Sequence, residues 1–199
     1  MKNKSKIFIW LLIFLGISFF YLFFHNNSYE VLYEIRLPKL LIAIITGSGL
    51  GLVGAVFQAI FKNPLADPYL LGVSSGASLG TVIGFYFRLN SITYIGNFSI
   101  IFLSFITGLI TIFLVFTLSN FYKTFNMLSL ILSGVILNVL FYALSYLIIA
   151  SDYFRLHNVI LWLWGKISIY DFSTILLSLI LICIYYFYLL YNYKILNLF

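Results

Sequence analysis

The chain has 199 residues, of which 63% are hydrophobic and only 8% charged, with a formal net charge of +6. This composition excludes a soluble globular domain, in which the apolar share is about half. A single cysteine, Cys183, excludes a disulfide framework and a cluster of cysteine metal ligands. The basic residues are scattered between apolar runs, so the positive charge does not indicate nucleic-acid binding. The composition predicts an all-α, polytopic helical membrane protein.

Six apolar runs are long enough to span a membrane as helices. About 20 apolar residues cross a hydrocarbon core of roughly 30 Å, and backbone groups in lipid must pair within the segment. The runs do not alternate as barrel strands would. The first run is predicted to be a retained span because no A-x-A cleavage site follows it, and a signal anchor is the alternative. The predicted spans are 7–24, 40–61, 69–87, 98–119, 127–150 and 172–191.

The basic residues favour a cytoplasmic N-terminus. That orientation places six of the 11 Lys and Arg residues inside, including Lys2, Lys4 and Lys6 before the first span, and five outside. Six spans then return the C-terminus to the cytoplasmic side. The longest outside loop contains Trp162 and Trp164, which suit a short interfacial helix or simple membrane-surface anchors.

Small residues recur every fourth position in the second and third predicted spans. Residues four apart lie almost above one another on a helix. In lipid, small residues at this spacing let two helices approach closely, so the pattern predicts tightly packed helices. The alternative is the ordinary tolerance of membrane helices for glycine. The two ladders are Ala43, Gly47, Gly51, Ala55 and Ala59, and then Gly72, Gly76, Gly80 and Gly84.

A short loop, NPLADP at 63–68, joins these two spans. Pro64 and Pro68 lack an amide donor and end helices. Asp67 is suited to cap the helix that follows, and Asn63 opens the turn. We predict a rigid elbow on the cytoplasmic side.

The fifth predicted span carries a polar stripe, because Gly134, Asn138, Tyr142 and Ser145 fall near one helical face. Such a stripe either hydrogen-bonds a neighbouring helix or faces a water-filled path. No Asp, Glu, Lys, Arg or His lies deep inside any predicted span, which argues against an ion-coupled mechanism. The sequence has no metal-spaced cluster, nucleophile–base set or phosphate loop, so no catalytic residue, metal or bound cofactor is predicted.

Four stretches resemble the permease subunits of ABC importers for iron-siderophore complexes, haem and vitamin B12. They are RLPK at 36–39, GAVFQAIFKNPLADPYLLGVSSGASLG at 54–80, LILSGVILN at 130–138 and WLWGKIS at 162–168. The resemblance implies a bacterial inner-membrane permease of about ten helices, of which this chain corresponds to the first six. It also implies a second permease copy, cytoplasmic ATP-binding subunits and an extracytoplasmic substrate-binding protein as partners.

The resemblance also assigns roles to single residues. It implies that the fifth span lines the translocation path, which makes Asn138, Tyr142 and Ser145 path candidates. Arg36 and Lys39 match the two basic residues of the family's RLPR motif, which meet acidic residues of the binding protein. Lys39 departs from the commoner arginine and offers only a point charge. For both residues the alternative is snorkelling at the start of a helix.

Family members continue beyond the point that matches the end of this sequence. Their coupling helices for the ATPase and last four spans have no counterpart in this sequence. We expect this chain to be the permease subunit of an importer. The alternatives are that it is a fragment of such a permease, half of a split permease, or a protein that assembles in a dimer mode of its own. An inert membrane protein that couples to nothing is the competing class.

Overall fold

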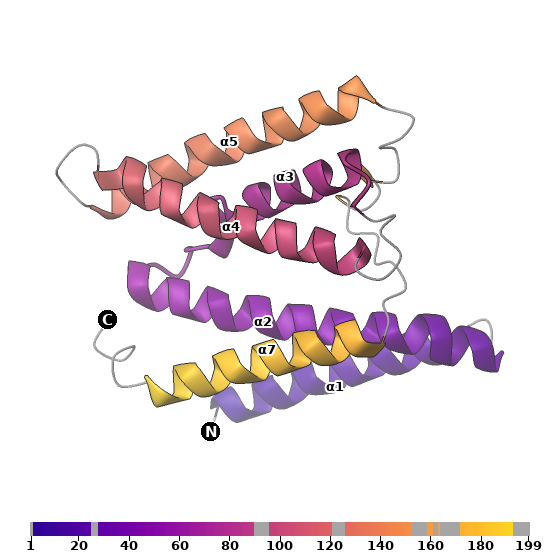
Figure 1. The fold of residues 1–199 in the computed structure, drawn as a ribbon. Helices are drawn as coiled ribbons and strands as arrows, with labels where there is room; N and C mark the ends of the chain where they lie inside the picture. Colours follow the sequence, from indigo (N-terminus) through magenta and orange to yellow (C-terminus); the bar gives the residue numbers. More distant parts are fainter. Residues whose placement is uncertain are drawn as a thin grey trace. The chain divides into compact units, whose positions relative to one another are not determined.

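The computed structural model describes residues 2–24, 28–89, 96–120, 126–152, 159–160, 163 and 172–192. Within these ranges every regular element is a helix, as predicted (Figure 1). The elements are α1 (Lys2–Phe23), the π-helix η1 (Val31–Arg36), α2 (Leu37–Phe61), the 3-10 helix η2 (Pro68–Leu71), α3 (Val73–Tyr86), α4 (Gly96–Asn120), α5 (Met127–Ser151) and α7 (Phe172–Tyr191).

Four segments of the described chain are long and apolar enough to cross a membrane. They are Ser5–Phe23, Val31–Phe61, Phe98–Asn120 and Met127–Ser151, and α7 is a shorter apolar helix. The third predicted span differs from the expectation, because α3 has only 14 residues. At 1.5 Å per residue α3 is about 21 Å long, less than the roughly 30 Å of a hydrocarbon core. The residues predicted to begin this span form η2 instead.

The chain divides into two compact units. One unit combines Met1–Ala55 with Ile167–Phe199 and therefore holds α1, η1, most of α2, and α7. The other is the continuous stretch Val56–Lys166, which holds the end of α2, the elbow, η2, α3, α4 and α5. Each unit is described by itself below.

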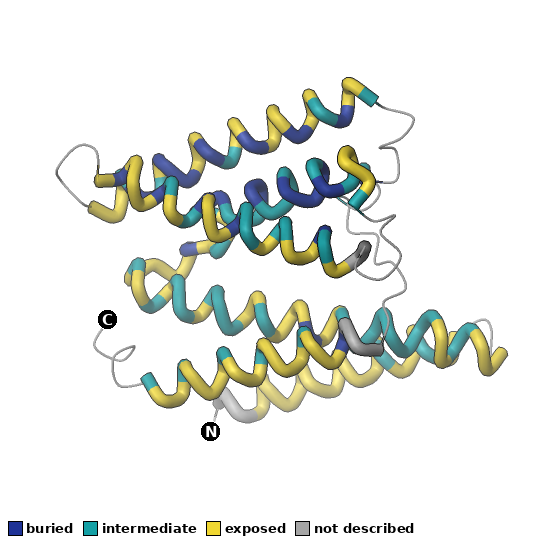
Figure 2. Tube along the Cα trace, in the orientation of Figure 1, coloured by how far each residue is buried: buried dark blue, intermediate teal, exposed yellow. Residues whose placement is uncertain are grey.

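In the continuous unit, α3 packs against both α4 and α5. Figure 2 shows buried residues along α3 and along one side of α5. The core between α4 and α5 is apolar and gathers Val115, Leu130, Leu137 and Phe141. A second cluster joins Val82 of α3 to Ile149 of α5. The shortest of these three helices is therefore the most enclosed one.

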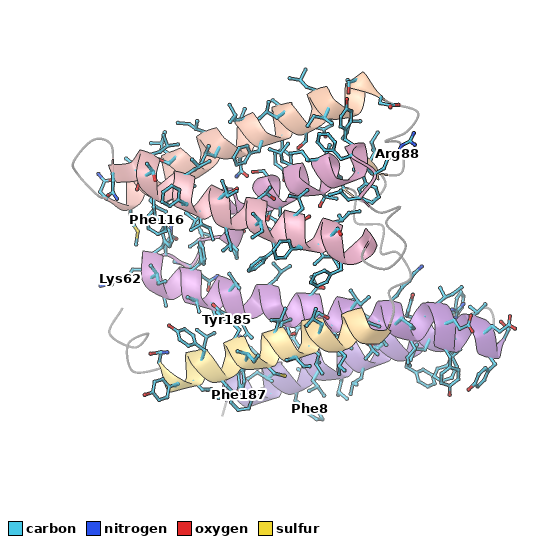
Figure 3. All side chains as sticks on the ribbon, in the orientation of Figure 1. Phe8, Lys62, Arg88, Phe116, Tyr185 and Phe187 are labelled. Atoms are coloured by element: carbon cyan, nitrogen blue, oxygen red, sulfur yellow. The ribbon has the colours of Figure 1, made fainter. Side chains whose placement is uncertain are left out.

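In the other unit, α1 and α7 expose long apolar side chains. Phe8 of α1 is 60% exposed and Phe187 of α7 is 67% exposed, and both point away from their helices (Figure 3). No residue in the apolar window of α1 is buried inside the structure. Apolar side chains facing outward all round a helix are typical of contact with lipid.

Candidate functional site

The elbow begins where α2 ends, in a Schellman motif. The Lys62 amide donates to the Ala59 carbonyl at 3.3 Å, and the Asn63 amide donates to the Gln58 carbonyl at 3.2 Å. These bonds require a left-handed residue after the helix, a position that glycine usually fills. Here Lys62 adopts it, with φ of 48°, and its side chain lies at the end of α2 (Figure 3). A positive charge at this point also complements the C-terminal end of the helix dipole.

Side-chain caps then fix the loop. Asn63 Oδ1 accepts from the Leu65 amide at 2.9 Å, and the Asn63 carbonyl accepts from the Ala66 amide at 3.1 Å. Asp67 Oδ1 accepts from the Tyr69 amide at 2.8 Å, with Pro68 at the first position of η2. The predicted cap at Asp67 is confirmed, although it begins η2 and not a long helix. Together with the restricted prolines, these bonds make the elbow a defined turn.

Gly72 differs from its predicted role. It lies between η2 and α3 with φ of 72°, so it is a left-handed connector and not a member of a helical glycine ladder. A Cβ at this position would also meet the Gly134 carbonyl oxygen at 2.9 Å and Asn138 Oδ1 at 3.4 Å. Spacing alone suggested a ladder member because Gly76 follows four residues later, but the helix begins only at Val73.

The elbow rests directly on α5 through a contact that we call the elbow seat, formed by Tyr69, Leu70, Gly72, Gly134 and Asn138. Asn138 Nδ2 donates to the Tyr69 carbonyl at 3.1 Å, and the same oxygen accepts from the Gly72 amide at 3.1 Å. A Cβ at Gly134 would overlap the Leu70 carbonyl. Gly72 and Gly134 thus allow the backbones of the elbow and of α5 to approach closely, and the side-chain amide of Asn138 joins them through a hydrogen bond. The spacing of the polar residues allowed Asn138 to hydrogen-bond a neighbouring helix, but it did not identify Tyr69 as the partner.

The helical part of the second ladder faces α4. A Cβ at Gly76 would overlap the Thr111 hydroxyl and lie 3.1 Å from the Thr107 carbonyl oxygen. A Cβ at Gly80 would overlap the Thr107 hydroxyl, and one at Gly84 would lie 3.3 Å from Ile100 Cγ1. Threonines of α4 therefore occupy the space that the missing side chains leave, as expected for close helix packing in lipid.

Hydroxyl groups line the same α3–α4 seam. Thr81 Oγ1 lies 2.5 Å from Ser104 Oγ and also donates to the Ala77 carbonyl at 3.1 Å. Thr111 Oγ1 donates to the Thr107 carbonyl of its own helix at 2.7 Å. Since the hydroxyls are satisfied locally, they can be buried without an unpaired polar group.

The first ladder has a different environment. A Cβ at Gly47 or Gly51 would meet no described atom within 4 Å. The glycine of α2 that faces a neighbour is Gly49, where a Cβ would lie 3.0 Å from Ile182 Cδ1 of α7. An apolar groove of about 460 Å³ lies beside this contact, and its lining comprises Ser48, Gly51, Leu52, Ile182, Cys183 and Tyr186. The predicted packing role of Gly47 and Gly51 therefore has no partner within the described part of this unit.

The three path candidates on α5 lie in different environments. Ser145 is only 2% exposed, and its hydroxyl donates to the Phe141 carbonyl at 2.8 Å, so it lies on the packed face and not on an open surface. Asn138 belongs to the elbow seat. Tyr142 is 42% exposed and lies at the margin of the buried face. The position of Ser145 fits the packing alternative for the stripe, and a place for Ser145 in the translocation path stays a prediction.

The RLPK stretch lies inside a continuous helix, whereas the second span was predicted to begin at residue 40. η1 runs into α2, and the Leu37 amide donates to the Leu32 carbonyl in a π-type bond. Pro38 explains the wide turn, since its ring would clash with the carbonyl four residues earlier in a regular α-helix. Lys39 is half-buried.

Arg36 is also half-buried, and its side chain reaches α1. Its Nη1 donates to the carbonyl oxygens of Tyr21 at 3.2 Å and Leu22 at 2.8 Å. This contact gives Arg36 a structural role that the sequence did not predict. Trp162 and Trp164, the predicted interfacial residues, lie outside the described residues.

Several known proteins are similar in sequence to this chain over most of its length. The FecCD transport family matches residues 5–199. The uncharacterized ABC transporter permease protein YvrB of Bacillus subtilis is 39% identical over 151 residues, which cover 75% of this chain and 42% of that protein. The hemin transport system permease protein HmuU of Yersinia pestis is 35% identical over 157 residues, covering 77% of this chain and 46% of that protein.

A solved structure shares the fold over nearly the whole chain. It is described as an inward-facing conformation of a candidate metal-chelate type ABC transporter. The superposition has a TM-score of 0.77 at 30% identity and covers 98% of this chain and 63% of that one. The chain spans less than half the length of the two curated relatives named above. The match across residues 5–199 shows that the chain belongs to the FecCD transport family.

Proposed function

We propose that this chain forms part of the membrane permease of an ATP-driven importer, with iron chelates or haem as the substrate class. The observation that carries the proposal is the family match over residues 5–199, which includes the elbow, the elbow seat and the RLPK turn. The hemin permease of Yersinia pestis supports the substrate class. Transport is proposed for the assembly that contains this chain, since the chain spans less than half of that relative.

The energy source in this proposal lies outside the helices. The apolar stretches 40–61, 69–87, 98–119 and 127–150 contain no Asp, Glu, Lys, Arg or His. Ion-coupled carriers place such groups inside the membrane in spite of their cost. Separate cytoplasmic ATP-binding subunits would therefore supply the work, and the permease would supply the path and its gating motions.

The path in this proposal runs beside α5, against a second permease copy. Tyr142 is the most exposed of the three path candidates, and Asn138 is half-buried. Asn138 would act indirectly, because it ties α5 to the elbow. An extracytoplasmic binding protein would dock at Arg36 and Lys39, which the proposed cytoplasmic N-terminus places on the outer side.

Uptake by cells tests the proposal. The gene is deleted in frame from the chromosome and restored on a plasmid, and uptake of iron-55 siderophore complexes, haem and labelled cobalamin is measured. We expect the deletion to abolish uptake of one iron compound and the plasmid to restore that uptake. Depletion of ATP should abolish uptake in the undeleted strain and in the strain that carries the plasmid. Uptake that is unchanged by deletion for all three compounds would refute the proposal, and loss of cobalamin uptake alone would refute the substrate class.

A further inference from the structure

The helix α3 runs beside only one half of its neighbour α4. Its first residue, Val73, lies against the middle of α4, since a Cβ at Gly108 would lie 3.5 Å from Val73 Cγ1. Gly108 is twelve residues from each end of α4. From there α3 runs toward the start of α4, where Gly84 faces Ile100. Figure 1 shows that α3 is likewise much shorter than α5, so α3 begins inside this unit and not at its edge.

The elbow seat also lies far from the end of α5. Gly134 and Asn138, its two residues on α5, follow Met127 by seven and eleven residues. At 1.5 Å per residue they lie about 10 and 16 Å along the helix. Because α5 is long enough to cross a membrane, a hydrocarbon core of roughly 30 Å would enclose both residues. The backbone of residues 68–72, which rests on them, therefore reaches membrane depth, although the elbow was predicted to lie on the cytoplasmic side.

Backbone outside an α-helix is restricted at this depth. Lipid offers no hydrogen bonds, so such backbone occurs only where protein buries it or where it lines a water-filled cavity. The elbow seat buries one side of the segment, because the Tyr69 carbonyl accepts from Gly72 and Asn138 and both Gly72 and Gly134 are buried. The other side is open, since the Tyr69 side chain is 51% exposed.

Asp67 indicates what covers the open side. This residue is exposed, and its Oδ1 accepts from the Tyr69 amide at 2.8 Å, so the carboxylate lies at nearly the same depth as Tyr69. Within the described residues this cap is the one hydrogen bond of the carboxylate. A carboxylate that faces lipid is costly, and one that is buried in protein needs a cation or further donors. Water meets the requirement without either.

We propose that the exposed side of the elbow lines a water-filled vestibule that opens to the cytoplasm and ends at the elbow seat. Leu65, Asp67 and Tyr69 form this lining, and all three are exposed. Residues 62–65 are exposed as well, so the open side continues from Asp67 back to the end of α2. The vestibule is the inner part of the proposed transport path, and only this assignment rests on the proposed function.

Thiol labelling in native membranes tests water access. Tyr69→Cys and Phe113→Cys are each made in a Cys183→Ala background, and a charged, membrane-impermeant methanethiosulfonate reagent is added to inverted and right-side-out vesicles. Phe113 is the matched control, because it is 70% exposed and lies seven residues from the end of α4, at a depth similar to that of Gly134. We expect Tyr69→Cys to react about a hundredfold faster than Phe113→Cys, since apolar surroundings disfavour the reactive thiolate, and to react only in inverted vesicles.

Three results would overturn the proposal. Tyr69→Cys that reacts as slowly as Phe113→Cys would show that lipid or another polypeptide covers the elbow. Phe113→Cys that reacts as fast as Tyr69→Cys would show that water access does not distinguish the elbow from the rest of this depth. Reaction of Tyr69→Cys in right-side-out vesicles would contradict the cytoplasmic opening.

A measurement without substitutions covers the case in which Tyr69→Cys does not fold. In water-edited solid-state NMR on the full native chain in liposomes, magnetisation from water should reach the Asp67 carboxyl carbon well before the Phe113 ring. Equal build-up at the two sites would overturn the vestibule. Neither measurement depends on uptake, so failure of the proposed transport and failure of the vestibule are distinguishable.

Discussion

At the scale of single residues, the most important glycines are those that are constrained both by backbone conformation and by a close neighbouring atom. Gly72 needs a left-handed backbone and also faces the Gly134 carbonyl, whereas Gly54 in α2 has no described atom within 4 Å of an added Cβ. The four-residue spacing predicted that Gly72 belongs to the glycine ladder. Such spacing indicates periodicity but does not reveal the backbone torsion angles of a residue. The Asp67 cap was predictable, since its proline neighbour and position define a helix start. The contact of Arg36 with α1 was not, because nothing local links residues 14 and 15 positions apart.

Gly72→Ala should destabilise the chain by about 2–3 kcal/mol. The left-handed conformation costs an alanine roughly 1–2 kcal/mol, and the contact with the Gly134 carbonyl adds to it. The free energy of unfolding in mixed micelles, measured by steric trapping, checks this value. Gly54→Ala is the control and should be neutral or slightly stabilising, since alanine is favoured over glycine in helices. Equal effects of the two substitutions would contradict the assigned role of Gly72.

At the scale of elements, α3 is short because its start is used for the elbow. Gly76 and Gly80 of α3 face threonines of α4, and η2 rests on Gly134 of α5. The sequence predicted that the described elements are helices, since apolar length and composition decide this in lipid, but it predicted the third span to begin at residues that form η2. It could not decide whether the polar stripe on α5 packs or faces water, because both environments favour the same residues. The structure places Ser145 on the packed side, while Tyr142 remains accessible.

Gly76→Leu should prevent α3 and α4 from packing. Overpacking costs about 1–3 kcal/mol even where side chains can move, and here the obstacle includes the Thr107 carbonyl, 3.1 Å from the added Cβ. We expect loss of folded protein after purification, measured by size-exclusion chromatography and thermal unfolding. Gly47→Leu is the matched control, because no described atom lies near its Cβ position, and it should leave folding of the isolated chain unchanged. A normally folded Gly76→Leu variant would exclude the α3–α4 seam as a close interface.

At the scale of the whole molecule, the chain combines two units with different exposure. The continuous unit has buried clusters that involve α3, α4 and α5. The other exposes the apolar faces of α1 and α7. Family membership was predictable because NPLADP and its flanks are a specific stretch. The division into units was not predictable, since it depends on contacts between distant segments.

Both ends of the chain are expected on the cytoplasmic side. Single cysteines replace Ser5 and Asn192 in a Cys183→Ala background, and a membrane-impermeant thiol reagent is added to right-side-out and inverted vesicles. We expect both positions to react only in inverted vesicles, because three lysines precede the first span. Labelling of the two positions from opposite sides would contradict the even number of crossings, and a cysteine in place of Lys62 serves as a further cytoplasmic marker.

The division of the chain has a consequence for its synthesis. The stretch Val56–Lys166 is uninterrupted, whereas the other unit needs both ends of the sequence. A ribosome therefore completes α3, α4 and α5 before α7 exists, and at about 5–20 residues per second the remaining residues to Tyr191 take about 1–5 s. During that interval lipid or the insertion machinery must cover the side of α2 at Gly49 that later meets α7. Slowed translation after residue 166 would lengthen this exposure and give proteases more time to act on α2.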